Sequence, residues 1–436
     1  MKTSKYNLVI KYLLTIFILS LYLSSCASQK PLSEARQKEF DSLLEAGKKA
    51  FYDKNYSNAI ETLKKAAVIK DDDQEVHYFL GYAFERFSSN DGSSMLENKR
   101  TYIKKASDHF RKVIEINPEY KGESVVLDPY SKLTSLWGSL AIAYITKGKA
   151  DSARWAFQQG YNTGGFFPSV MEYNRDIMAT CDSNAILFTN GDNDTFPMWY
   201  LQYIERYRTD ITVINLSLLN TSWYTKQLKN AYPFGSNNLY LSLQDSYIDS
   251  LRSLIFPEKY IQLAVPDDSL VPAGYMQWLV KPTINNKYVR IQDLLVLKIL
   301  TDNSWHRPVY FSTTVANINL LGLDDFLQME GLAMRLVPYE GHTVSAEKIS
   351  ANLFKTYRYE HIGDEYNTYV PGMLGLYGNY RIALYVLARE YLRNSEKDKA
   401  RDALDLMNKK MPPDVIPVVN AQLDKLLKQL DDVLKL

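Results

Sequence analysis

The feature that most constrains the fold is a regular spacing of small residues in the first third of the chain. Gly47 and Gly81 lie 34 positions apart in the 436-residue sequence. In the first copy, Gly47 is followed by Ala59, Leu63 and Ala66 at offsets of 12, 16 and 19. Small side chains at such offsets let two neighbouring helices cross closely, while larger ones fill the space between turns. The spacing predicts an array of stacked helix pairs.

The same pattern recurs further along the chain. Ala106 and Pro118 keep a 12-residue separation after an insertion around "SSNDGSSMLENKR", and a third copy places Ala153 and Phe157 at equivalent positions. Thirty-four residues is the length of a tetratricopeptide repeat, which these copies resemble. We therefore predict a tetratricopeptide-repeat helical domain over residues 36–180. A generic bundle of helical hairpins is the alternative interpretation.

The last part of the chain, residues 341–436, carries a similar pattern. Its residues at repeat-like offsets are Ala388, Tyr391, Ala400, Leu404 and Pro412. The final stretch "AQLDKLLKQLDDVLKL" places leucines along one face of an amphipathic helix. We expect one more repeat-like helix pair, capped by this last helix.

The hydrophobic period changes between the two helical parts, over residues 181–340. Short runs rich in β-branched and aromatic residues appear there: "AILFT", "ITVINLSL", "YIQLAV", "PVYFSTT" and "AMRLVP". Helical patterns such as "PMWYLQYIERY" and "VRIQDLLVLKIL" separate some of them. Strands that alternate with helices indicate a mainly parallel sheet covered on both faces. The predicted fold class is thus an α/β core, Rossmann-like, flanked by all-α tetratricopeptide-like repeats.

The N-terminus indicates export. Lys2 and Lys5 precede the apolar run "LLTIFILSLYL", and small residues follow it up to Cys26. This arrangement is typical of a secretory signal. The sequence "LSSC" resembles the lipobox of bacterial lipoproteins, which implies a signal peptide over 1–25, a lipidated linker over 26–35 and a lipid anchor on Cys26. By analogy with lipoprotein sorting, Ala27 favours the outer membrane, facing the periplasm.

Composition excludes some classes of function. The chain has 51 Lys and Arg against 50 Asp and Glu, mixed along its length, so no nucleic-acid surface is expected. Of two cysteines, lipidation of Cys26 leaves Cys181 alone, so no intramolecular disulfide is expected in the mature chain. The 33 tyrosines fit either helical-repeat packing or carbohydrate-binding surfaces.

The candidate site follows the first predicted strand, in "AILFTNGDNDTFPMWY". Acid-rich turn residues at the carboxyl end of a strand are how many α/β proteins present a ligand site. Carboxylates and amides beside aromatic faces suit the hydroxyls and ring C–H groups of a sugar. The candidate ligand-binding residues are Asn190, Asp192, Asn193, Asp194, Thr195, Trp199, Asn220, Trp223, Asp324 and Asp325.

Other interpretations of the two aspartates stay open. They resemble the Asp-x-Asp of nucleotide-sugar glycosyltransferases, which holds a divalent cation. They also resemble a phosphatase pair of nucleophile and general acid, which Ser217 and the acidic pair at 324–325 would complete. In the structural alternative, Asp194 or Thr195 caps the helix that Pro197 opens. No cofactor is predicted, although a divalent cation is possible, and the lone His306 is interpreted as structural.

Several blocks of the sequence resemble one known family. They are "NAILFTNGDNDTFPMWYLQYIERYRTDITVINLSLLNTSWY", "RPVYFSTTV", "GLDDFLQMEGLAMRLVP" and "NYRIALYVLAREYL…MPPDVIP", within roughly residues 180–415. The family consists of bacterial polytopic membrane proteins, O-mannosyltransferase-like, and the resemblance is to their soluble C-terminal region. The resemblance implies a module related to glycan transfer that here carries repeats and a lipid anchor in place of the membrane enzyme.

These features together predict a cell-envelope lipoprotein that acts as a binding or scaffold component in glycan or glycoprotein assembly. The repeats would hold an envelope protein partner, and the strand end at 190–195 would hold a glycan or another polar ligand. The alternative is a periplasmic enzyme, phosphohydrolase or glycan-transfer related, that uses Asp192 and Asp194.

Overall fold

The computed structural model describes residues 32–91, 95–230, 238–266, 271–341, 344–364 and 370–435. The predicted signal peptide and the predicted lipidation site, Cys26, lie outside these residues. Among the described residues, no helix is both long and apolar enough to cross a membrane.

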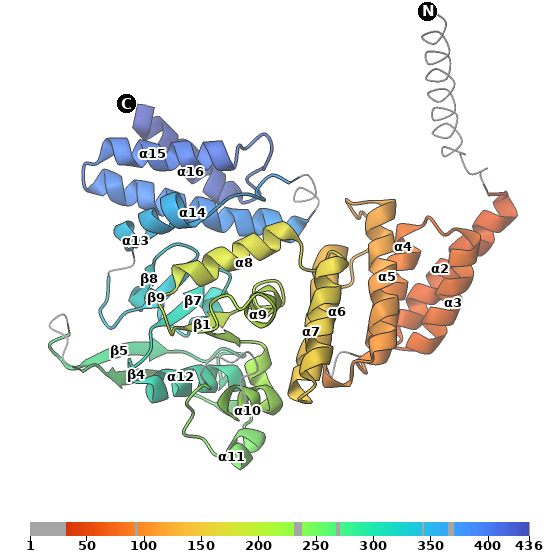
Figure 1. Ribbon diagram of the computed structural model, residues 1–436, viewed down its shortest axis with the longest axis horizontal. Helices are drawn as coiled ribbons and strands as arrows, with labels where there is room; N and C mark the ends of the chain where they lie inside the picture. Colours follow the sequence, from red (N-terminus) through yellow and green to blue (C-terminus); the bar gives the residue numbers. More distant parts are fainter. Residues whose placement is uncertain are drawn as a thin grey trace, which may run out of the picture.

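The N-terminal third consists of helices packed in successive pairs, α2 with α3, α4 with α5 and α6 with α7 (Figure 1). Their bounds are α2 Glu34–Tyr52, α3 Tyr56–Ile69, α4 Gln74–Ser88, α5 Arg100–Ile116, α6 Pro129–Thr146 and α7 Ala150–Asn162, with the short η1 Met95–Glu97 before α5. The sequence prediction of helix pairs is confirmed at this level.

The repeated glycines lie where the paired helices touch. A Cβ atom added to Gly47 would lie 2.6 Å from the Leu63 side chain, and one added to Gly81 would lie 2.7 Å from the Phe110 ring. Ala59, Leu63 and Phe110 are fully buried. The small residues therefore allow close helix crossing, as the spacing predicts.

A five-stranded sheet forms the core of the middle region, with strand order β2-β1-β7-β9-β8. Its strands are β1 Ile186–Thr189, β2 Thr212–Asn215, β7 Val309–Ser312, β8 Leu327–Met329 and β9 Ala333–Leu336. β1 pairs in parallel with both β2 and β7, whereas β9 runs antiparallel to β7 and β8. The sheet is thus mixed, and the prediction of a mainly parallel sheet holds only for its first three strands.

One predicted strand belongs to a different sheet. The run "YIQLAV" contributes to β4 Lys259–Ala264, which pairs antiparallel with β5 Tyr275–Val280 as a separate hairpin. A second small pair joins β3 Leu254–Ile255 to β6 Tyr288–Val289. Side chains alternate between exposed and buried along β5, as expected for a ribbon with one covered face.

Helices lie on both sides of the main sheet, with α8 on one side and α12 on the other in Figure 1. The helices and short helical turns of this region are α8 Pro168–Thr180, α9 Phe196–Tyr203, η2 Leu218–Asn220, α10 Ser222–Asn230, α11 Asp245–Ser250, α12 Ile291–Asn303, η3 Asn317–Asn319 and η4 Asp324–Phe326. From β1 the chain passes through α9 to β2, and it then returns past β1 to β7.

The C-terminal helices lie beside α8 in Figure 1, away from the first helix pairs. They are α13 Ala346–Ala351, the π-helical η5 Asn352–Thr356, α14 Pro371–Arg393, α15 Lys397–Lys410 and α16 Ala421–Lys435. α14 packs on α15, and α16 contacts both, so the expected pair with a capping helix is present. The buried Arg381 side chain donates hydrogen bonds to the carbonyls of Met411 and Ile416, which ties α14 to the loop after α15.

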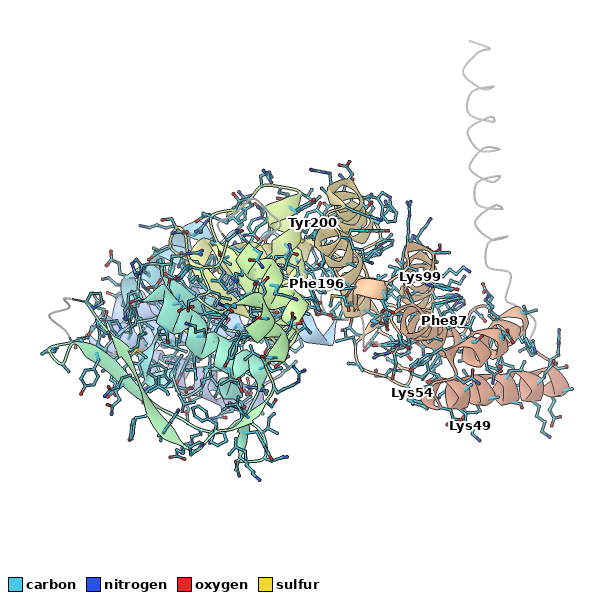
Figure 2. The ribbon with its side chains drawn as sticks, turned by 90° about the horizontal axis from the view of Figure 1, so that it is seen from below. Lys49, Lys54, Phe87, Lys99, Phe196 and Tyr200 are labelled. Carbon is cyan, nitrogen blue, oxygen red and sulfur yellow. The ribbon has the colours of Figure 1, made fainter. Side chains whose placement is uncertain are left out.

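The helix pairs and the sheet region meet through α6, α7 and α9. A Cβ atom added to Gly138 of α6 would lie 2.2 Å from the Phe196 ring of α9. The Tyr200 ring packs against Phe157 and Tyr161 of α7, at centroid distances of 6.2 and 5.5 Å. Figure 2 shows Phe196 and Tyr200 at this junction. The strand end that follows β1 is therefore positioned next to the helical array.

Candidate functional site

The carboxyl ends of β1, β2 and β7 meet at one edge of the sheet because these three strands are parallel. The residues at this edge form a buried polar network. The hydroxyl oxygens of Thr189 and Thr195 lie 2.7 Å apart, and the Asn215 amide donates a hydrogen bond of 2.9 Å to the Thr195 oxygen. The network fixes the backbone that turns from β1 into α9.

Asp194 holds this turn together. Its carboxylate accepts hydrogen bonds from the backbone N–H of Asn190, at 2.7 Å, and of Gly191, at 2.6 Å, and from the Thr314 hydroxyl after β7. Only 4 % of Asp194 is exposed. Burial raises the pKa of this carboxyl, and the three donors oppose that rise. Its bonding capacity is used within the protein.

The predicted capping role is wrong in its detail. Thr195 is the residue that precedes α9, but its side chain makes no capping hydrogen bond, and the Asp194 carboxylate bonds backward to residues 190 and 191 instead. The first N–H of α9, from Phe196, reaches the Asp192 carbonyl oxygen at 3.0 Å. Asp194 therefore stabilises the end of the strand rather than the start of the helix.

Asp192 faces the helical array. It is half-buried, and burial raises the pKa of its carboxyl, while the Ser135 hydroxyl and the Lys132 ammonium of α6 oppose the rise. The Lys132 ammonium also forms an ion pair of 3.1 Å with the buried Glu85 of α4. The charge environment of Asp192 is thus supplied by helices of the array.

Asn193 and Asn190 connect the turn to distant segments. The Asn193 amide donates to the Ser131 hydroxyl of α6 at 2.8 Å, and its backbone carbonyl accepts from the buried Asn174 of α8 at 2.8 Å. The buried Oδ1 atom of Asn193 has no hydrogen-bond partner within the described part of the chain. The Asn190 side-chain oxygen accepts from the Asn319 amide at 3.2 Å.

A cleft opens at this sheet edge, with a volume of 270 Å³. It is lined by Leu127, residues 190–194, Thr314, Gly372 and Leu376. The cleft thus collects residues from the array, from the loops after β1 and β7, and from α14. Its polar side chains are the carboxylates of Asp192 and Asp194, the carboxamides of Asn190 and Asn193, and the Thr314 hydroxyl. Such groups suit hydroxyl groups or a cation's water shell.

The predicted aromatic platform is not present at the cleft. Trp199 and Tyr224 are each 1 % exposed and belong to the hydrophobic core, where their rings pack 6.1 Å apart. Trp223 is half-buried against Tyr224 and does not line the cleft. The prediction that Trp199 and Trp223 present stacking faces to a ligand is wrong, because the start of α9 turns its aromatic residues into the core.

Asp324 and Asp325 lie at the opposite edge of the sheet. They precede β8, which runs in the same direction as β7 because both are antiparallel to β9. Tyr310, the second residue of β7, and Gln328, the second residue of β8, both pair with Arg335 of β9, so the two strands begin at the same level. Both acids are exposed. The prediction that they join the site with Asp192 is wrong, because β8 begins where β1 and β7 begin.

Asn220 is connected to Asn190 indirectly, through Ser217, whose hydroxyl donates to the Asn190 carbonyl, and through a series of side-chain amides. Its side chain exchanges hydrogen bonds with Gln292 of α12, at 2.7 and 3.1 Å. The Gln292 amide in turn donates to Asn319 at 3.2 Å, and Asn319 donates to Asn190. A chain of side-chain amides therefore runs along the sheet edge, with Asn220 at its far end.

The site contains residues that the sequence analysis missed. They are Ser131, Lys132 and Ser135 of α6, together with Asn215, Gln292, Thr314 and Asn319. Asn215 lies within the predicted run "ITVINLSL" and Thr314 ends the run "PVYFSTT", so polar residues toward the ends of these runs were a usable signal. Nothing in the sequence pattern indicates that α6 packs over this edge.

A second cleft, of 780 Å³, lies in the helical array and is mainly apolar. Its lining includes Ile114 and Pro118 at the end of α5, Tyr130 and Leu133 of α6, and Phe166 and Phe167 before α8, with Arg111 and Glu115 also facing it.

Comparison with known proteins finds a match for part of this chain. Residues 170–281 and 255–353 match the model of a family described as TMEM260-associated domain 2. The matched part runs from α8 into η5 and includes the main sheet and the cleft residues 190–194 and Thr314, whereas Leu127, Gly372 and Leu376 of the cleft lie outside it. It is similar to a domain linked to TMEM260, an O-mannosyltransferase-like protein, which agrees at this level with the resemblance found in the sequence. A comparison with curated proteins gave no match.

Proposed function

We propose that this chain is a binding component of the bacterial cell envelope that holds a polar ligand, such as a sugar unit of a glycan, at the sheet edge beside Asp192. In this proposal the chain is a lipoprotein anchored through Cys26 to the outer membrane and facing the periplasm. It acts in glycan or glycoprotein assembly by recognising and binding this ligand.

The position of the cleft is the observation that carries the proposal. β1 lies between β2 and β7, so the chain leaves β1 in one direction and later returns to its other side. In open α/β sheets of the Rossmann-like kind, ligands bind outside the carboxyl ends of the strands where the order reverses in this way. The cleft at residues 190–194 and Thr314 opens at that place.

The chemistry of the cleft favours binding over catalysis. The Asp194 carboxylate accepts three hydrogen bonds from within the protein and is 4 % exposed, which suits a positioning role rather than that of a nucleophile. The half-buried carboxylate of Asp192 lines the cleft and offers acceptors for ligand hydroxyls. A sugar would be held by carboxylate and amide groups rather than by ring stacking.

A protein partner on the helical array is the second element of the proposal. The spacing of Gly47 and Gly81 and the close crossing of their helices support a tetratricopeptide-like array. The apolar cleft between α5 and α6 has the volume and the aromatic lining that a partner's apolar side chains fill. Tyr130 and Leu133 of α6 line that cleft, and the same helix also faces Asp192.

Thermal unfolding of the full-length chain tests the proposal. We would measure the midpoint with and without a panel of envelope sugars, for the parent chain and for Asp192→Ala. A ligand at a hundred times its dissociation constant adds about 2.7 kcal/mol to the free energy of unfolding. We expect one sugar to raise the midpoint in the parent and to have no effect in Asp192→Ala.

Asp324→Ala is the matched control, because Asp324 is an exposed aspartate at the opposite edge of the sheet. It should keep the parent's response to the sugar. If the sugar stabilises Asp192→Ala as much as the parent, the ligand binds elsewhere and the proposal fails.

A further inference from the structure

A small pocket lies in the C-terminal helices, between α14 and the segment that leads into α16. It has a volume of 220 Å³. Within the described part of the chain, Arg381 is the one charged residue that lines it. We infer that this pocket binds a small carboxylate, which the Arg381 guanidinium attracts and whose short aliphatic body lies against the apolar walls. This inference is independent of the proposed sugar site.

The Arg381 side chain is a buried cation without a counter-charge. Only 1 % of the residue is exposed. Burial lowers the pKa of its guanidinium, and none of the acids that the structure describes acts against this shift. Arginine is rarely buried so fully unless it is paired with an acid, because an unpaired charge outside water is unfavourable. A bound anion would supply the missing partner.

The hydrogen bonds of Arg381 do not neutralise its charge. Its two Nη atoms donate to the backbone carbonyls of Met411, Ile416 and Pro417. Carbonyl groups are dipoles and carry no net charge. The buried Nε atom has no hydrogen-bond partner among the described residues, so the set of partners around the guanidinium is incomplete. The segment that supplies these carbonyls continues directly into the wall of the pocket, at Val418.

The lining of the pocket favours one class of anion. A single guanidinium matches the single charge of a carboxylate, which it binds through charge-assisted hydrogen bonds. A doubly charged phosphate would keep one charge unmatched there. Much of the remaining wall is aliphatic, from Leu374, Ile382, Val418 and Leu423. A carboxylate on a short apolar body therefore suits both parts of the lining.

Two glycines of α14 provide the space for this body. Gly375 and Gly378 both line the pocket. A Cβ atom added to either glycine would have nothing within 4 Å beyond its own stretch of helix. A larger side chain at position 378 would therefore occupy the pocket without displacing a neighbour, which makes this position useful for a test.

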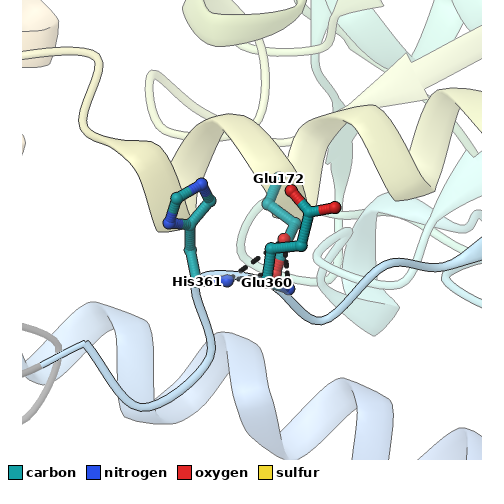
Figure 3. Close-up of side chains that lie close together, drawn as sticks. All are labelled: Glu172, Glu360 and His361. Carbon is teal, nitrogen blue, oxygen red and sulfur yellow. Dashed lines mark hydrogen bonds between the residues drawn. The ribbon is translucent and has the colours of Figure 1, made fainter.

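The wall that α14 contributes is fixed on the sheet region. The Asn379 amide, which lines the pocket, donates a hydrogen bond of 2.7 Å to the Tyr173 hydroxyl of α8. Ahead of α14, the chain is tied to the same helix, because the Glu172 carboxylate accepts the backbone N–H of Glu360 at 2.7 Å and of His361 at 3.2 Å (Figure 3). A wall that is held in shape before binding lowers the entropy cost of binding a ligand.

Equilibrium dialysis of the full-length chain against radiolabelled butyrate tests the inference. We expect one equivalent to bind, with a dissociation constant in the millimolar range or below, as is usual for so small a ligand. Butyramide has nearly the same shape without the charge, so it should compete at least about tenfold more weakly. Arg381→Met should weaken butyrate binding by a similar factor, and circular dichroism checks that this variant is folded.

Gly378→Leu is the second variant, since it keeps the guanidinium and fills the open space, and it should abolish butyrate binding. Arg389→Met is the matched control, because Arg389 is an exposed arginine of the same helix, and it should bind butyrate as the parent does. The inference is overturned if the parent binds no butyrate, if butyramide competes equally well, or if Gly378→Leu binds butyrate as tightly as the parent. Sugar binding is measured without butyrate, so the two sites succeed or fail separately.

Discussion

Asp194 and Asp192 lie two positions apart but contribute differently to the fold. Asp194 satisfies two backbone N–H groups and the Thr314 hydroxyl in a buried setting. Removal of its carboxylate leaves these donors without an acceptor, so we expect Asp194→Ala to lower the free energy of unfolding by about 3 kcal/mol. Asp192 is half-buried, and Asp192→Ala should cost less than about 1 kcal/mol. Urea unfolding followed by circular dichroism measures both, and equal losses would contradict these separate roles.

Local residues of the site were predictable, whereas their distant partners were not. The motif at 190–195 was identified because polar turn residues follow an apolar strand. Thr314 and Ser131 are separated from it by more than a hundred and about sixty residues, and only the folded sheet and α6 bring them close. Trp199 was misassigned because an aromatic residue at a helix start can face either a ligand or the core, and its sequence neighbours do not distinguish the two.

His109 gives the array a pH-dependent stability. Burial, and then the neighbouring His77 with its ring nitrogen 2.9 Å away, lower the pKa of His109 to about 4. In the unfolded chain His109 has the ordinary histidine pKa of about 6.5. Between pH 6.5 and 4 the unfolded chain therefore binds a proton at this residue, whereas the folded chain keeps it neutral. The contribution of His109 to the free energy of unfolding is therefore complete above pH 6.5 and is lost as the pH falls toward 4.

We expect this loss to be roughly 2 kcal/mol, since His109 is only partly buried. Urea unfolding at a series of pH values measures it. His109→Gln removes the titrating group and should flatten the curve between these pH values. An unchanged slope in His109→Gln would assign the pH dependence to other groups.

At the scale of elements, an added methyl group should have opposite effects on stability at two helical glycines, one at a close helix crossing of the array and one in α14. Gly81 of α4 faces the Phe110 ring, and an added Cβ would lie 2.7 Å from it. We expect Gly81→Ala to cost about 2 kcal/mol through overpacking. Gly378 of α14 has open space around its added Cβ, so Gly378→Ala should gain up to about 1 kcal/mol from helix propensity. Chemical unfolding of both variants gives the signs, and a stabilising Gly81→Ala would contradict the close crossing.

The helices and strands were predicted more reliably than the pairing of the strands. Helix pairs leave a periodic signal of small residues, and the strands β1, β2 and β7 were recognised from short apolar runs. Such a run does not show which strand it pairs with. The segment at 259–264 therefore went to a separate hairpin, and β9 turned out antiparallel. Pairing depends on long-range packing, which local residue patterns do not encode.

At the scale of the whole molecule, α6 belongs to two units at once. It pairs with α7 in the array, and it packs against α9 and the turn that holds Asp192. The Ser131 hydroxyl accepts a hydrogen bond from Asn193 of the turn, the Lys132 ammonium acts on the Asp192 carboxyl, and Gly138 meets Phe196. A partner that shifts α6 would therefore also change the cleft at the sheet edge, which makes α6 the element through which the array and the ligand site can influence each other.

This shared helix predicts that the array and the sheet region unfold together. In Gly138→Ala the added methyl group would lie 2.2 Å from a Phe196 ring atom and 2.7 Å from its Cβ, so the two units must separate slightly. We expect the parent to give one main calorimetric transition. Gly138→Ala should either divide this transition or lower its midpoint by several degrees, whereas Gly378→Ala should do neither. An unaltered trace for Gly138→Ala would mean that α6 does not couple the two units.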